Sequence, residues 1–86
     1  MRFMVQSTPT QALTAETQAL IPAESARGQT LDAQGVRLAL YVAADFSGAW
    51  QVYQVDSLAA LMSILESFPL HPYVQYKITP LVDDTR

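Results

Sequence analysis

The chain switches between two kinds of hydrophobic periodicity, and the order of these switches limits the folds that it can adopt. Strand-like alternation occurs in RFMVQ at 2–6, in VRLALYVA at 36–43 and in AWQVYQV at 49–55. Two longer stretches with helical spacing separate these segments, and a last strand-like segment follows Tyr73. The predicted order is therefore strand, helix, strand, strand, helix, strand.

This order is that of the ferredoxin-like split βαβ arrangement. We therefore predict a single α+β domain over residues 1–86, in which a four-stranded antiparallel sheet carries both helices on one face. The segment ADFSG between the second and third strands suits a short hairpin loop.

Residues 14–34 form the first helical stretch, and Thr14 is a suitable N-cap. Pro22 lies inside this stretch, and an internal proline removes a backbone hydrogen bond and clashes with the preceding turn. We expect a kink there, or a break after Leu20 with a new helix beginning at Pro22. Ser57 is expected to cap the second helix and Pro69 to end it.

Alternation within the strands predicts which side chains share a face of the sheet. One set should lie beneath the helices, while the other mixes aromatic rings with amides, a composition that suits an association surface. We therefore expect two sheets to meet face to face in a homodimer. The predicted inner set is Phe3, Val5, Leu38, Leu40, Val42, Trp50, Val52, Val74, Tyr76 and Ile78, and the outer set is Met4, Gln6, Ala39, Tyr41, Gln51, Tyr53, Gln75 and Lys77.

The composition argues against several classes of function. The longest apolar run, residues 38–44, is far shorter than the ~20 residues that span a bilayer. The net charge is −3 and the five Lys and Arg residues are scattered, which argues against nucleic-acid binding. There is no cysteine, and the MRFMVQS start has no secretory signal features. We expect a cytoplasmic protein that binds neither membranes nor nucleic acid.

The segment SFPLHPYVQYKITPL at 67–81 resembles the muconolactone isomerase family, whose members have a similar ending rich in proline and aromatic residues. The similarity extends over PAESARGQTLDAQG at 22–35 and WQVYQVDS at 50–57, with comparable segment lengths. The resemblance implies a homo-oligomer of dimeric α+β barrels, with a decamer of five dimers as a possible assembly. It also implies a reaction that moves a double bond in a small unsaturated lactone by proton abstraction and return, without cofactor or metal.

The second strand departs from the family pattern. The isomerases carry an Arg-His-x-Trp-Arg run there, whereas an alignment without gaps from Gly35 places residues 38–42, LALYV, at these positions. Arg37 and Tyr41 could replace the missing basic and aromatic groups. One hypothesis is a cofactor-free isomerase-like or related acid–base enzyme acting on a small organic acid, lactone or cyclic intermediate. The alternative is a non-catalytic small-molecule-binding or homo-oligomeric assembly module of the same fold.

Glu24 and Arg27 are the candidate catalytic residues. They lie three positions apart on the first helix, on or beside the stripe that should face the sheet. In a pocket under the helix, Glu24 would act as base and Arg27 would stabilise an oxyanion. The alternative is a solvent-facing ion pair at the edge of the stripe, worth only ~0.3 kcal/mol.

Four further residues are candidates for substrate binding: Tyr41, Trp50, His71 and Tyr73. The rings of Trp50, Tyr53, Tyr73 and Tyr76 could wall a pocket for a flat organic ligand, although strand packing also explains such residues. The imidazole of His71 could titrate near neutral pH, or its ring could pack at a subunit contact. With one histidine and no cysteine, the sequence shows no recognisable metal-ligand spacing, so no metal is expected, and the family resemblance implies that no cofactor is needed.

Overall fold

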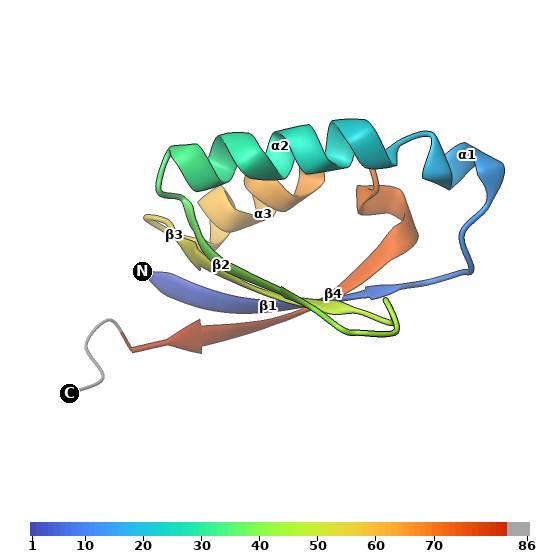
Figure 1. Cartoon of the computed structure of the whole chain (residues 1–86). Helices are drawn as coiled ribbons and strands as arrows, with labels where there is room; N and C mark the ends of the chain where they lie inside the picture. Colours follow the sequence, from blue (N-terminus) through green and yellow to red (C-terminus); the bar gives the residue numbers. More distant parts are fainter. Residues whose placement is uncertain (83–86) are drawn as a thin grey trace.

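The structure, a computed structural model, describes residues 1–82, so the predicted domain 1–86 extends four residues beyond the described part. Two helices lie across one face of a four-stranded sheet, and the predicted α+β fold is confirmed (Figure 1). The elements are β1 (Arg2–Pro9), α1 (Ala15–Gln18), α2 (Ile21–Ala33), β2 (Arg37–Val42), β3 (Ala49–Gln54), α3 (Leu58–Glu66), a 3-10 turn (His71–Tyr73) and β4 (Val74–Leu81).

The sheet is antiparallel throughout, with the strand order β2-β3-β1-β4. The central strand β1 pairs with β3 and, over its whole length, with β4. The β2–β3 ladder has a register shift between Arg37 and Ala39, which changes the alternation at the start of β2. This irregularity lies next to the turn that joins α2 to β2.

The helix ends follow the local signals in the sequence. Thr14 caps α1, since its Oγ1 accepts a hydrogen bond from the backbone N–H of Thr17 at 3.2 Å. Pro22 lies in the first turn of α2, where proline is tolerated, and the predicted break before it is observed. Ser57 caps α3 by accepting a hydrogen bond from the N–H of Ala60 at 3.1 Å.

The hydrophobic core lies between the inner face of the sheet and helices α2 and α3. The core is small, which fits the limited burial available to a chain of this length. Its buried members are Phe3, Val5, Leu31, Tyr53, Val55, Leu61, Leu65 and Phe68.

Within residues 1–82, no helix is long and apolar enough to cross a membrane.

Strand β3 faces the opposite way from the prediction. Tyr53 lies opposite the buried Phe3 in the β1–β3 ladder, so Tyr53 and Gln51 face the helices while Trp50 and Val52 point outward. The hydroxyl of Tyr53 donates a hydrogen bond to the side-chain oxygen of Gln51. The two polar groups therefore satisfy each other under the helices, and burial costs less than their polarity suggests.

Strand β2 also differs from a simple core strand. Leu40 and Val42 lie opposite Gln51 and Ala49, on the helix side as predicted, yet they are 44% and 51% exposed. Leu38, predicted to be internal, falls in the irregular part of the ladder and is 47% exposed. The space between α2 and β2 is therefore open rather than packed.

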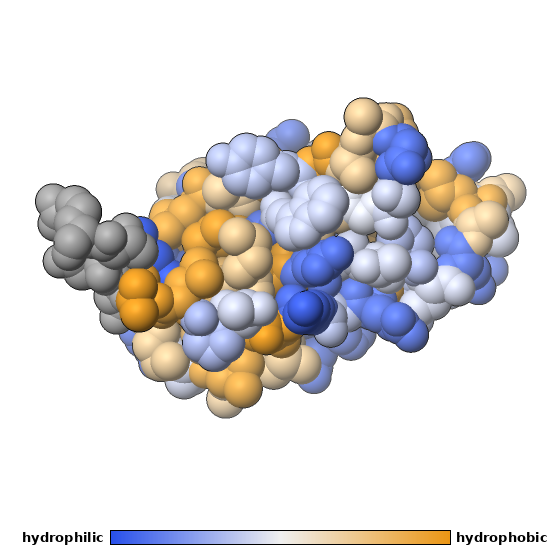
Figure 2. Space-filling view, turned by 90° about the horizontal axis from the view of Figure 1, so that it is seen from below, coloured by the Kyte–Doolittle hydropathy of each residue, from blue (hydrophilic) through white to orange (hydrophobic). Residues whose placement is uncertain are grey.

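The outer face of the sheet carries no helix from the described part of the chain (Figure 1). Tyr41 and Trp50 are paired neighbours on this face, with exposures of 65% and 39%. Figure 2 shows that hydrophobic side chains gather on this face in the half nearer the end of β4. We call the residues that point outward from the four strands the outer sheet face.

Replacement of Leu61 by Ala should lower the free energy of unfolding by about 2–5 kcal/mol, because the side chain is fully buried and its removal leaves a cavity. Leu58→Ala on the same helix is the matched control, since Leu58 is 50% exposed and should change stability by much less. Urea unfolding at one fixed protein concentration measures both. Equal losses would contradict the packing described here.

Candidate functional site

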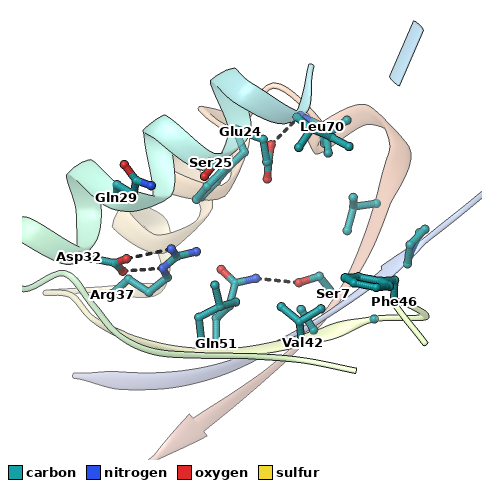
Figure 3. Close-up of a pocket in the computed structure, with 17 residues that line it drawn as sticks. Ser7, Glu24, Ser25, Gln29, Asp32, Arg37, Val42, Phe46, Gln51 and Leu70 are labelled. Atoms are coloured by element: carbon teal, nitrogen blue, oxygen red, sulfur yellow. Dashed lines mark hydrogen bonds and ion pairs between the residues drawn. The ribbon is translucent and has the colours of Figure 1, made fainter. Parts of the chain in front are cut away.

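A cavity of about 530 Å³ lies between α2 and the inner face of the sheet (Figure 3). Polar side chains reach it from α2, from the start of β2 and from the central strands. The remaining wall is largely apolar and includes Ile21, Leu40, Val42, Phe46 and Leu70. Its size and lining suit a small organic ligand.

Glu24 points from α2 into this cavity (Figure 3). Its Oε1 accepts a hydrogen bond from the backbone N–H of Leu70 at 2.9 Å. Burial raises the pKa of Glu24 above its ordinary value of 4.5, while the Leu70 amide and the charge of Arg37 act in the opposite direction. A carboxyl group in this setting can both accept and return a proton more readily than an exposed one.

Arg37 and Asp32 form a bidentate ion pair at the other end of the cavity (Figure 3). The Nε and Nη2 of Arg37 donate to the two carboxylate oxygens of Asp32 at 2.7 and 3.0 Å. The Arg37 side chain is only 9% exposed, whereas that of Asp32 is 48% exposed. The hydrogen bonds raise the pKa of Arg37 and lower the pKa of Asp32, so both groups stay charged.

Gly28 provides the room for this buried guanidinium. A Cβ at Gly28 would lie 2.6 Å from Nη2 of Arg37, closer than side chains approach one another. A glycine within a helix is ordinarily destabilising by about 1 kcal/mol relative to alanine. Here the missing side chain allows α2 to pass directly over Arg37.

Neutral hydrogen-bonding groups form the floor of the cavity. The Nε2 of Gln51 donates to Oγ of Ser7 at 2.8 Å, which leaves the hydroxyl proton of Ser7 free to donate. Burial raises the pKa of Tyr53 well above its ordinary value of 10. Burial, together with the nearby Glu24 carboxylate, raises the pKa of Tyr76 to about 12. Both phenols are therefore uncharged at neutral pH.

The structure brings Glu24 together with Arg37 rather than with Arg27. Arg27 does not line the cavity; its Nε donates to Oγ of Ser67 at 2.8 Å, at the end of α3. On α2, the residues that reach the cavity lie on the β2 side of the buried Gly28 and Leu31, whereas Arg27 lies on the α3 side.

The four predicted binding residues lie elsewhere than in the main cavity. Trp50 and Tyr41 lie opposite each other on the outer sheet face. His71 stacks on Tyr76, with ring centroids 5.7 Å apart, and its buried Nδ1 has no hydrogen-bond partner within the described residues. Tyr73 lines a separate pocket of about 70 Å³ beside α1. Across residues 1–82, no three His, Asp or Glu side chains cluster as a metal site would require.

Comparison with known proteins identifies the family. The family model of muconolactone delta-isomerase matches residues 1–85. The chain belongs to this family. A crystal structure of muconolactone isomerase is similar with a TM-score of 0.85 and 26% sequence identity, covering 98% of this chain and 91% of that one.

A second solved structure has the same fold at lower similarity. It is the 5-chloro-2-hydroxyhydroquinone dehydrochlorinase from Burkholderia phenoliruptrix AC1100 in complex with 2,5-dihydroxybenzoquinone, with a TM-score of 0.67 and 14% identity. The alignment covers 95% of this chain and 94% of that one. Among curated proteins, no sequence matches the chain.

Within this muconolactone isomerase family member, Asp32, Ser7 and Gln51 are cavity residues that the sequence reasoning did not identify. The sequence indicates Arg37 as a replacement for the missing basic groups but does not pair it with Asp32. The spacing of two opposite charges around the turn at Gly35 was the available signal for the Asp32–Arg37 pair. The burial of Gln51 depends on strand register and had no local signal.

Substitution of Gly28 by Ala should destabilise the protein, because the added methyl group would displace the guanidinium of Arg37 from its pair with Asp32. In an Arg37→Ala background the same change should instead stabilise the protein, by up to about 1 kcal/mol, because alanine has the higher helix propensity. Urea unfolding of the double-mutant cycle measures both effects. Effects of equal sign in the two backgrounds would contradict the close approach of Gly28 and Arg37.

Proposed function

We propose that the protein is a cofactor-free acid–base enzyme of the isomerase type that acts on a small organic acid, lactone or cyclic intermediate. Glu24 is its proton-transferring group, and Ser7 with Gln51 provides hydrogen-bonding groups for the reacting carbonyl. The observation that carries the proposal is a partly buried carboxyl group of raised pKa that points into a cavity of about 530 Å³. The proposed location is the cytoplasm.

The proposed reaction is a shift of a carbon–carbon double bond. The ionised Glu24 removes a proton from a carbon that is acidified by a carbonyl group, and the electron pair delocalises as a dienolate. The hydroxyl proton of Ser7 is available to stabilise the dienolate oxygen. Protonated Glu24 then returns the proton to another carbon of the conjugated system. The substrate and product are isomers, and the carboxylate is regenerated.

Family membership supports this class of chemistry, and the cavity supports the position of the reacting groups. Arg37 lies close enough to Glu24 to lower its pKa, so the cation favours the ionised base against the effect of burial. Arg27 has no part in this version of the site, because its side chain is bound to Ser67 outside the cavity. The alternative, a non-catalytic binding module, would use the same cavity without proton transfer.

The variant Glu24→Gln should lower kcat/KM for double-bond isomerisation by about 100-fold or more, because the amide cannot take up the proton. A panel of small unsaturated lactones, followed by ultraviolet absorbance, provides the measurement. Glu66→Gln, at the exposed end of α3, removes the same charge away from the cavity and should leave the rate unchanged.

The wild-type rate should also rise with pH through the pKa of Glu24, with a midpoint above the ordinary 4.5, because only the carboxylate acts as base. Full activity of Glu24→Gln would remove this residue as the base. Binding of lactones without any turnover would favour the non-catalytic module.

We also propose that two copies of the chain associate through the outer sheet face. In the described part of the chain no helix covers this face (Figure 1). The face exposes the neighbouring residues Tyr41 and Trp50. Amphipathic aromatic residues of this kind are enriched at protein–protein interfaces. Self-association is also consistent with membership of a family of oligomeric proteins. Assembly of dimers into a decamer stays a prediction.

The variant Trp50→Glu should shift the protein towards the monomer, because it places a desolvated, unpaired charge in the proposed interface. Light scattering after size-exclusion chromatography at micromolar concentration measures the mass. Leu58→Glu, an exposed position on α3, is the control and should keep the wild-type mass. A wild-type protein that is itself monomeric would rule out this interface.

A further inference from the structure

Within residues 1–82, the cavity lining offers a ligand no cation that lacks a carboxylate partner. Among the described residues, the charged side chains in the lining are Glu24, Asp32 and Arg37. Both oxygens of Asp32 already accept hydrogen bonds from Arg37, whose side chain is 9% exposed. With Glu24 ionised, the three groups sum to one negative charge.

The rest of the lining is uncharged. Ser7 and Gln51 provide a hydroxyl and an amide on the floor, and these groups can hydrogen-bond a carbonyl oxygen without adding charge. The apolar wall, which includes Leu40, Val42 and Phe46, can cover a small ring. The lining therefore matches a compound with one apolar ring and one polar oxygen function.

A carboxylate ligand would be poorly accommodated in the same space. It would lose its hydration on entering and would lie near the carboxylates of Glu24 and Asp32. The guanidinium of Arg37 already donates from Nε and Nη2 to the carboxylate of Asp32, which balances its charge, so a ligand carboxylate would meet no unbalanced cation. A second negative charge would also oppose ionisation of Glu24, which the proposed reaction requires.

We propose that the cavity selects uncharged cyclic carbonyl compounds, such as lactones without a carboxylate substituent, and discriminates against the corresponding carboxylates. The inference rests on the proposed function for the chemistry of the site and narrows its substrate class. The residues that set the preference are Asp32, which neutralises the available cation, and Glu24, which supplies the net charge.

The test compares muconolactone, a carboxylate, with its primary amide, which is neutral and of nearly the same shape. Isothermal titration calorimetry with the full chain at neutral pH measures both dissociation constants. The amide should bind about tenfold or more tightly than the carboxylate, a difference of about 1.4 kcal/mol. This readout involves binding alone, so it does not depend on turnover.

Two variants test the origin of the preference. Asp32→Asn and Glu24→Gln each remove one negative charge from the lining, and each should reduce the preference for the amide about tenfold. Glu66→Gln removes an exposed charge outside the cavity and should leave the preference unchanged. Unchanged binding of the amide shows that each variant is folded. Glu24→Gln keeps the Arg37–Asp32 pair intact and provides the test if Asp32→Asn does not fold.

The outcomes separate this inference from the proposed function. A carboxylate that binds wild-type protein as tightly as the amide would overturn the charge preference while leaving Glu24 as a possible base. A preference that responds equally to Asp32→Asn and Glu66→Gln would overturn the role of Asp32. Selective binding of the amide with no isomerisation of it would support the charge preference and count against the proposed enzyme activity.

Discussion

The buried guanidinium of Arg37 is the constraint on which the site depends. It lies directly under Gly28 of α2 and is held by the carboxylate of Asp32. The pair joins the last turns of the helix to the first residue of β2, across the turn at Gly35, whose φ of +73° suits glycine. The charged side chain of Arg37 can be buried because two of its nitrogen atoms donate to the Asp32 carboxylate, which itself stays partly exposed to solvent. The position of α2 over β2, and so the roof of the cavity, is tied to this contact.

The same pair sets the electrostatics that Glu24 experiences. Burial raises the pKa of Glu24. The hydrogen bond from the Leu70 amide and the charge of Arg37 both oppose that rise. Asp32 in turn cancels most of the cation as seen from the cavity. The result is a carboxyl group that can take part in proton transfer within a space that has no net positive charge. The electrostatic role of Glu24, Arg37 or Asp32 therefore follows from its position relative to the other two, and not from its residue type alone.

The parts of the fold that depend on local sequence were predicted correctly. The strand and helix order, the break before Pro22 and the cap at Ser57 each follow from a few neighbouring residues. One feature that depends on a distant residue, the facing of β3, was predicted wrongly. The facing of β3 is fixed by the pairing of Tyr53 with Phe3, and apolarity alone favoured Trp50 instead.

The candidate site shows the same division. Glu24 was identified because helical spacing placed it near the sheet, and the structure places it in the cavity. Arg27, the predicted partner of Glu24, lies on the α3 side of the helix and outside the cavity. A pattern of apolar residues cannot resolve on which side of the helix such a residue lies. Arg37 reaches the cavity because the ladder is irregular between it and Ala39, a feature of strand pairing that no short segment encodes.

The hairpin between β2 and β3 contains one residue, Phe46, that combines a strained backbone with a place in the cavity wall. Phe46 has a left-handed backbone conformation, with φ of +61°, and this residue is 79% exposed at the wall of the cavity. Such a conformation costs a non-glycine residue of the order of 1 kcal/mol. A glycine there would relieve this strain but would also remove the part of the cavity wall that Phe46 forms. An unstrained backbone and a complete cavity wall are thus opposing demands on one residue.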